Sequence, residues 1–107
     1  MKYLKKLYGK TVIDSSDSEE MEGDRKIELE YYETKKNILF FKSNKPYGIE
    51  VVKRCKKKEK TNIETAIINN ICKQEQDTYR LLEILKTNKV TPISVKEIIS
   101  DLRVSLG

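Results

Sequence analysis

The fold of this chain is decided by Lys26-Ile27-Glu28-Leu29-Glu30-Tyr31-Tyr32-Glu33, where apolar and charged residues alternate. With a period of two, Ile27, Leu29 and Tyr31 share one face, and the charged side chains lie on the other. This pattern is typical of an antiparallel strand that has one face in a core and one face in water. The segment therefore predicts a sheet, and the neighbouring sequence is interpreted as further strands of it.

Four more segments carry strand patterns: residues 2–13, 37–42, 47–55 and 63–71. The second contains Ile38-Leu39-Phe40-Phe41, which is too short for a helix. In the third, the pattern places Tyr47, Ile49, Val51 and Cys55 inward and Gly48, Glu50, Val52 and Arg54 outward. In the fourth, the alternating face consists of Ile63, Thr65, Ile67, Asn69 and Ile71. Residues 34–37 are interpreted as a hairpin link and residues 56–60 as a hairpin tip.

From Lys73 the period changes to that of a helix. Leu81, Leu82 and Leu85 form a stripe, Cys72 is predicted as the N-cap and Asn88 as a left-handed C-cap. Strands followed by helices predict an α+β domain, in which two C-terminal helices pack on one face of an antiparallel sheet of about five strands formed by the N-terminal two-thirds.

The final helix is predicted from Asn88-Lys-Val-Thr-Pro-Ile-Ser-Val-Lys-Glu97. Pro92 keeps Thr91 out of the α region, so the preceding helix ends before it. Ser94 and Glu97 have capping-box spacing, and Ile93 and Ile98 have hydrophobic-staple spacing. The helix then presents an apolar face made of Val95, Ile98, Ile99, Leu102 and Leu106.

The length of the chain predicts one domain, and its charges are segregated along the sequence. A chain of 107 residues with 37% apolar content is enough for a single α+β domain over residues 1–107. Residues 1–13 sum to +4, 14–34 to −7, 35–60 to +8 and 61–107 to zero. Residues 14–24 are predicted to be a flexible acidic loop, which folds over the basic strands or competes with an anionic partner for them. Its acidic spacing does not match an EF-hand, so no metal site is expected.

The pairing of Tyr47-Gly-Ile-Glu-Val-Val52 with Asn88-Lys-Val-Thr-Pro-Ile93 and the terminal helix resembles a family of small uncharacterised bacterial proteins catalogued only as a domain of unknown function. The resemblance covers roughly residues 25–104 and brings no activity, ligand or catalytic residue with it. It implies a cytosolic bacterial protein of this approximate architecture.

Catalysis is not expected. The chain has no histidine, which removes the usual acid-base group near neutrality and the commonest zinc ligand. Glu28, Glu30, Glu50 and Glu64 are assigned to outward strand positions, where solvated surface explains them better than a carboxylate mechanism. The four glycines form no nucleotide-binding loop. We therefore predict a protein that is not an enzyme and has no catalytic residues, no cofactor and no metal.

The cellular setting is predicted from the cysteines and from hydropathy. Cys55 and Cys72 are too few for a disulfide framework, although a single bridge between them stays open as an alternative. No segment has the apolar length of a signal peptide or a membrane span. The sequence therefore predicts a cytoplasmic protein without membrane contact.

Two kinds of partner remain, and the favoured one is another protein, bound by a non-enzymatic interaction or regulatory module. The alternative is nucleic acid, with anion contacts from a basic hairpin made of Lys53, Arg54, Lys56, Lys57, Lys58 and Lys60. Bases would then stack on aromatic residues of the sheet. Lysine outnumbers arginine 18 to 4, which weakens the nucleic-acid reading. A homo-oligomer through an edge strand is a further prediction.

Overall fold

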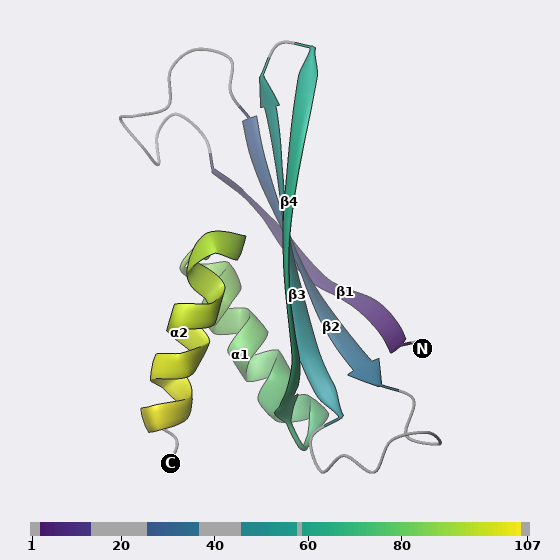
Figure 1. Cartoon of the computed structure of the whole chain (residues 1–107), viewed down its shortest axis with the longest axis vertical. Coiled ribbons are helices and arrows are strands. Elements are labelled where there is room, and N and C mark those ends of the chain that lie inside the picture. The colour runs from purple at the N-terminus through teal and green to yellow at the C-terminus, as the bar shows by residue number, and fades with distance from the viewer. Residues whose placement is uncertain (1–2, 14–25, 37–45, 58, 106–107) are drawn as a thin grey trace.

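The structure, a computed structural model, describes residues 3–13, 26–36, 46–57 and 59–105. Four antiparallel strands form one sheet in the order β1 (Tyr3–Ile13), β2 (Lys26–Lys36), β3 (Tyr47–Lys57) and β4 (Lys60–Cys72). The helices α1 (Glu75–Thr87) and α2 (Pro92–Ser105) lie together on one face of this sheet (Figure 1). The predicted α+β class, with a sheet followed by two helices, is confirmed.

The strand count differs slightly from the prediction of about five. The expected strand at residues 38–41 lies outside the described residues, as does the predicted acidic loop at 14–24. Residues 34–36, predicted as part of a hairpin link, instead continue β2 to Lys36, where Thr34 pairs with both Lys5 and Gly48. Cross-strand pairing on both sides keeps these residues extended.

The core lies between the sheet and the two helices. The alternation in β2 and β3 is confirmed, since the helix-facing residues of both strands are fully or almost fully buried: Leu29, Tyr31, Ile49 and Val51. They pack in one cluster with Leu82 and Leu85 of α1 and with Val95 and Ile99 of α2. Burying this apolar surface on both layers is what holds the helices to the sheet.

A hydrogen bond fixes the turn between the helices to the centre of the sheet. The Tyr31 hydroxyl donates to the Val90 carbonyl oxygen at 2.8 Å, inside the core. The Val90 N–H donates to the Leu85 carbonyl oxygen at 2.9 Å, so the turn is also closed onto the end of α1. Burial raises the pKa of the Tyr31 hydroxyl, which keeps it protonated as a donor.

The predicted face of β4 is wrong for most of the strand. Ile63 and Ile67 are exposed and lie on the face away from the helices, whereas Ala66 is buried beneath them. Aliphatic residues occupy both faces of β4, so alternation alone could not distinguish the faces. Only Ile71 of the predicted face is buried in the core.

An irregularity in β4 lies beside Gly48. Residues 47 to 49 of β3 face residues 68 to 72 of β4, and Asn70 has φ 58°. The extra residues bring the β4 backbone close to Gly48, where a Cβ would collide with the Ile68 carbonyl oxygen and lie 2.8 Å from Thr34 Oγ1. Glycine at position 48 is thus required by close approach of a backbone.

The helix ends also differ from the predictions. α2 begins at Pro92, and the Ser94 and Val95 N–H groups donate to the Thr91 carbonyl oxygen, so Ser94 lies inside the first turn and is not the N-cap. Proline suits the first helical position because its missing N–H is unpaired there in any helix. The predicted staple is also wrong, since Ile93 is 78% exposed.

At α1, the N-cap is Gln74 and not Cys72, which still belongs to β4. The C-cap is Asn88 as predicted, but its φ is −93°, and the left-handed residue is Lys89 with φ 51°. The Asn88 side-chain amide donates to the Ile84 carbonyl oxygen at 2.7 Å, and the Asn88 backbone N–H donates to the same oxygen at 3.1 Å, so Asn88 closes the last turn of α1 twice.

Gly48→Ala is expected to destabilise the protein by about 1–3 kcal/mol, because the new methyl group meets a fixed backbone oxygen. Urea denaturation measures the change in free energy of unfolding. Gly9→Ala is the matched control: its Cβ would lie 2.9 Å from Lys86 Cδ, a flexible side-chain atom that can move. Equal losses in the two variants would contradict this account of Gly48.

Tyr31→Phe is expected to cost about 1–3 kcal/mol, because the Val90 carbonyl is left buried without its donor. The same denaturation experiment measures it. Tyr79→Phe serves as the control, since the Tyr79 hydroxyl accepts only an exposed hydrogen bond from Lys6 and its loss should change stability by no more than about 0.5 kcal/mol.

Candidate functional site

The face of the sheet away from the helices, here called the open face, has a regular transverse order. The strand register aligns side chains from all four strands in rows across the sheet. One row contains Val12, Glu28, Arg54 and Ile63; the next contains Lys10, Glu30, Val52 and Thr65; the third contains Leu7, Tyr32, Glu50 and Ile67. The first and third rows each begin and end with an aliphatic residue on an edge strand.

The centre of the open face is an ion-paired strip. Arg54 Nε donates to Glu30 Oε1 at 3.0 Å, and Lys10 Nζ lies 3.6 Å from Glu30 Oε2. Lys5 Nζ forms an ion pair with Glu50 and lies 4.1 Å from the centre of the Tyr32 ring. These contacts join the edge strand β1 to the inner strands β2 and β3 across the open face.

Glu30 and Glu50 therefore correct the sequence prediction. They lie on the predicted outward face, yet they are only 8% and 4% exposed and are ion-paired, not solvated. Burial acts to raise the pKa of Glu30, but hydrogen bonds from Arg54 and Tyr32 and the charge of Lys10 outweigh it, and the net pKa is lowered. Glu28 is half-buried on the same face, whereas Glu64 is exposed and belongs to the helix-facing side.

Four aliphatic side chains surround this strip. Leu7 and Val12 on β1 are 45% and 41% exposed, and Ile63 and Ile67 on β4 are 56% and 40% exposed. These side chains give the face apolar area that a partner can remove from water, although their order, with charges at the centre and apolar residues at the border, is the reverse of the common apolar core with a polar rim. Leu7 and Ile67 are separated by three strand spacings, or about 14 Å.

The predicted basic hairpin forms, but its cations are divided between two faces. Lys57 pairs with Lys60 at the hairpin end, and Lys56, Lys57 and Lys60 are exposed. Arg54 and Lys56 belong to the open face, whereas Lys53, Lys57 and Lys60 belong to the other, and Arg54 is already held by Glu30. Lys58 lies outside the described residues.

The tyrosines of β2 and β3 are divided between the two faces of the sheet. Tyr31 is buried under the helices, and Tyr47 is half-buried on the same side, with Lys35 Nζ 5.4 Å from its ring centre. Tyr32 does lie on the open face, where it contacts Lys5. Phe40 and Phe41 lie outside the described residues.

A buried carboxyl group under α1 was missed by the sequence analysis. Glu33 is 5% exposed, lies within hydrogen-bonding reach of the Glu75 carboxyl in the first turn of α1, and its Oε2 finds no hydrogen-bond partner among the described residues. Burial and the second carboxyl raise the pKa of Glu33 to about 7. Nearby Lys6 donates instead to the Tyr79 hydroxyl at 3.2 Å. Glu33 stands two residues after Tyr31 and therefore on the same helix-facing side of β2, and this spacing could have indicated from sequence that Glu33 is buried.

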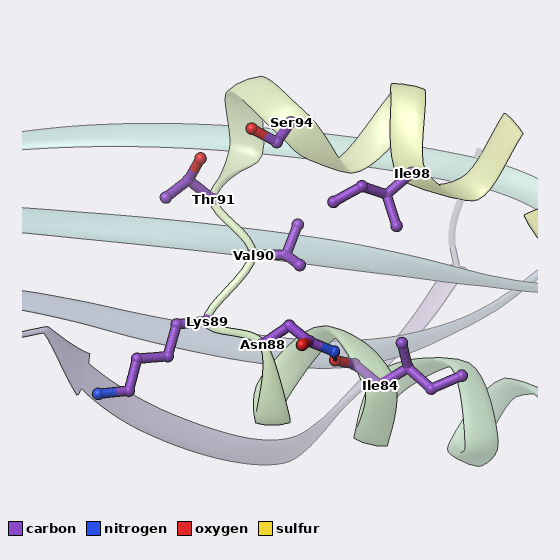
Figure 2. Close-up of a pocket in the computed structure, with 7 residues that line it drawn as sticks. All are labelled: Ile84, Asn88, Lys89, Val90, Thr91, Ser94 and Ile98. Carbon is purple, nitrogen blue, oxygen red and sulfur yellow. Dashed lines mark hydrogen bonds between the residues drawn. The ribbon is translucent and has the colours of Figure 1, made fainter. Parts of the chain in front are cut away.

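A hollow of about 410 Å³ lies between the helices at their connecting turn (Figure 2). Val90 is buried at its base, and the other lining residues are Ile84, Asn88, Lys89, Thr91, Ser94 and Ile98. The Asn88 amide is used by Ile84, and the walls are mainly apolar or hydroxyl-bearing. This composition suits an apolar side chain and offers no acid-base pair.

Metal and thiol chemistry find little support in the part of the chain that the structure describes. No group of three or more Cys, Asp or Glu side chains is arranged there to hold a metal ion. No disulfide joins Cys55 and Cys72, so the alternative of a bridge between them is not realised. Among the described residues, neither helix has the length and apolar character needed to cross a bilayer.

One comparison with known proteins gave a match. A model described as a family of unknown function (DUF6514) matches residues 10–105. No curated protein and no solved structure matches the chain.

The Glu33 carboxyl predicts a dependence of stability on pH. Because its pKa is higher in the folded state than the ordinary glutamate value, the folded state binds the proton more tightly. The associated stability is complete at acidic pH and is lost as the pH rises towards about 7.

Wild-type protein is therefore expected to lose on the order of 2 kcal/mol of unfolding free energy between pH 5 and pH 8, and Glu33→Gln should remove most of that loss. Urea denaturation at each pH measures it. Glu97→Gln, at an exposed position of α2, is the control and should keep the wild-type profile. A wild-type profile that is flat, or that Glu33→Gln leaves unchanged, would show that this carboxyl is not the cause.

Proposed function

Since the chain belongs to DUF6514, a family of unknown function, we propose from its own surfaces that it is a non-enzymatic module that binds another protein across the open face of its sheet. The observation that carries the proposal is the pattern of this face: exposed Leu7, Val12, Ile63 and Ile67 around an ion-paired centre. Its partner presents apolar side chains spaced to meet the two aliphatic borders, and polar groups between them.

The energetics of the face favour docking over catalysis. Its carboxylates are held by Arg54, Lys10 and Lys5, so they are neutralised and positioned before any partner arrives. A surface that is already ordered loses little side-chain entropy on binding. The exposed aliphatic residues supply the apolar area that association removes from water.

We place this module in the cytoplasm of a bacterial cell as part of the proposal. Two half-buried thiols that are not joined by a disulfide suit a reducing compartment. The proposed binding by the open face does not depend on this cellular location.

The alternative function, nucleic-acid binding, is supported by one observation, the exposed Lys56, Lys57 and Lys60 at the β3–β4 hairpin end. Such a site would contact phosphates only, and its affinity would fall steeply with salt.

The proposal is tested by crosslinking tagged protein in cells, removing nucleic acid with nuclease, identifying the captured polypeptide and measuring its affinity with both proteins purified. We expect the double variant Leu7→Glu, Val12→Glu to weaken binding by about tenfold or more, since it places charge on the apolar border. Leu4→Glu is the matched control, because Leu4 is 72% exposed on the same strand but on its other face.

Two results would contradict the proposal. One is a purified complex whose affinity the double variant does not change. The other is recovery of nucleic acid alone, released by nuclease and by moderate salt and lost in Lys56→Gln, Lys57→Gln, which would favour the alternative.

A further inference from the structure

The two edges of the sheet differ in how they are protected. β1 carries Lys5, Lys6 and Lys10, has no acidic residue, and contains an irregularity between Leu7 and Gly9. Charged side chains and irregular backbone are the usual means by which an edge strand avoids pairing with another chain. Pairing of β1 with a copy of itself would also gather like charges.

β4 lacks this protection over most of its length. From Lys60 to Ile68 it carries one cation and one carboxylate, and its β-branched residues are Thr61, Ile63, Thr65, Ile67 and Ile68. Residues 60–65 and residue 67 are exposed, and the irregular backbone comes only later, at Asn70. A long regular edge of this composition is suited to accept another strand.

We propose that β4 pairs antiparallel with β4 of a second copy of the chain, about a two-fold axis that passes through Thr65. In this register Ile63 faces Ile67 of the partner subunit, and Ile67 faces Ile63 of the partner subunit. Both apolar contacts are generated by one symmetric arrangement, as an isologous interface requires.

The side-chain pattern selects this register. Ile63 and Ile67 are 56% and 40% exposed, lie on the same face, and stand two residues on either side of Thr65. Directly opposed side chains in antiparallel strands come within about 5 Å, so each isoleucine is covered by the other. Glu64 then faces Ala66, and Lys60 lies beyond the regular pairing, so no like charges are directly opposed.

A competing register uses less of the strand. An axis through Asn62 would place Lys60 opposite Glu64, but it pairs only residues 60–64 and leaves Ile67 outside the contact. The Thr65 register pairs residues 62–68, which precede the irregular backbone at Asn70, and it covers both isoleucines.

The pairing goes beyond the proposed function and does not depend on it. It joins two four-stranded sheets edge to edge. Since both helices of one copy lie on one face of its sheet (Figure 1), the pairing makes the two open faces continuous and leaves the helices of both copies on the opposite side. A single strand pair is a small interface, so the dimer is weak and its population depends on concentration.

Sedimentation velocity on the full chain, at about 10 and 300 µM, spans the affinities of such an interface. Wild-type protein is expected to shift from monomer to dimer over this range. The variant Ile63→Lys, Ile67→Lys opposes like charges in the Thr65 register and should stay monomeric.

The matched variant Ile63→Glu, Ile67→Lys places opposite charges across the same axis and should dimerise again. Its glutamate lies beside Arg54 and its lysine beside Glu50 within the subunit, so the fold is retained, which circular dichroism checks for all variants. Wild-type protein that stays monomeric at the higher concentration overturns the proposal. So does a dimer that survives in Ile63→Lys, Ile67→Lys, or a dimer that the matched variant fails to restore.

Discussion

The hydrogen bond from Tyr31 to Val90 joins the middle of the sheet to the turn between the helices, and it fixes this turn on the apolar core that holds both helices. A buried carbonyl needs a donor, and here the donor comes from the central strand β2. With the turn fixed to the middle of β2, α1 and α2 cover one end of one face of the sheet. The other face and the β3–β4 hairpin end are left uncovered (Figure 1).

The two faces of β2 are stabilised by different physics. On the helix side, Leu29 and Tyr31 are removed from water with the leucines of α1. On the open face, Glu30 is removed from water as a charge, and Arg54 and Lys10 offset the cost. Glu33 is the exception, because it has the parity of the core and no cation bonded to it among the described contacts. The Glu33 carboxyl is buried and has a raised pKa, so it retains its proton and avoids placing a charge in the core.

This division gives the sheet two surfaces with separate roles in our interpretation. The open face is ordered by ion pairs and bordered by aliphatic residues, whereas β4 offers an unguarded backbone edge. The basic hairpin end is a third feature, but the pleat sends its cations to both faces, which divides the positive field that the linear sequence suggested. Pleating thus explains why a cluster in sequence need not be a cluster in space.

By itself, the sequence determined the layer order, the alternation of β2 and β3, and the presence and order of the two helices, because each depends on local periodicity. Tertiary structure decided the rest. The face of β4 depended on which aliphatic side the helices covered. The start of α2 at Pro92 is different, because it follows from local chemistry that the capping-box prediction at Ser94 overlooked. The pairing of Glu30 with Arg54 and the burial of Glu33 beside Glu75 join residues distant in sequence, so only the register of the strands and the docking of α1 could bring them together.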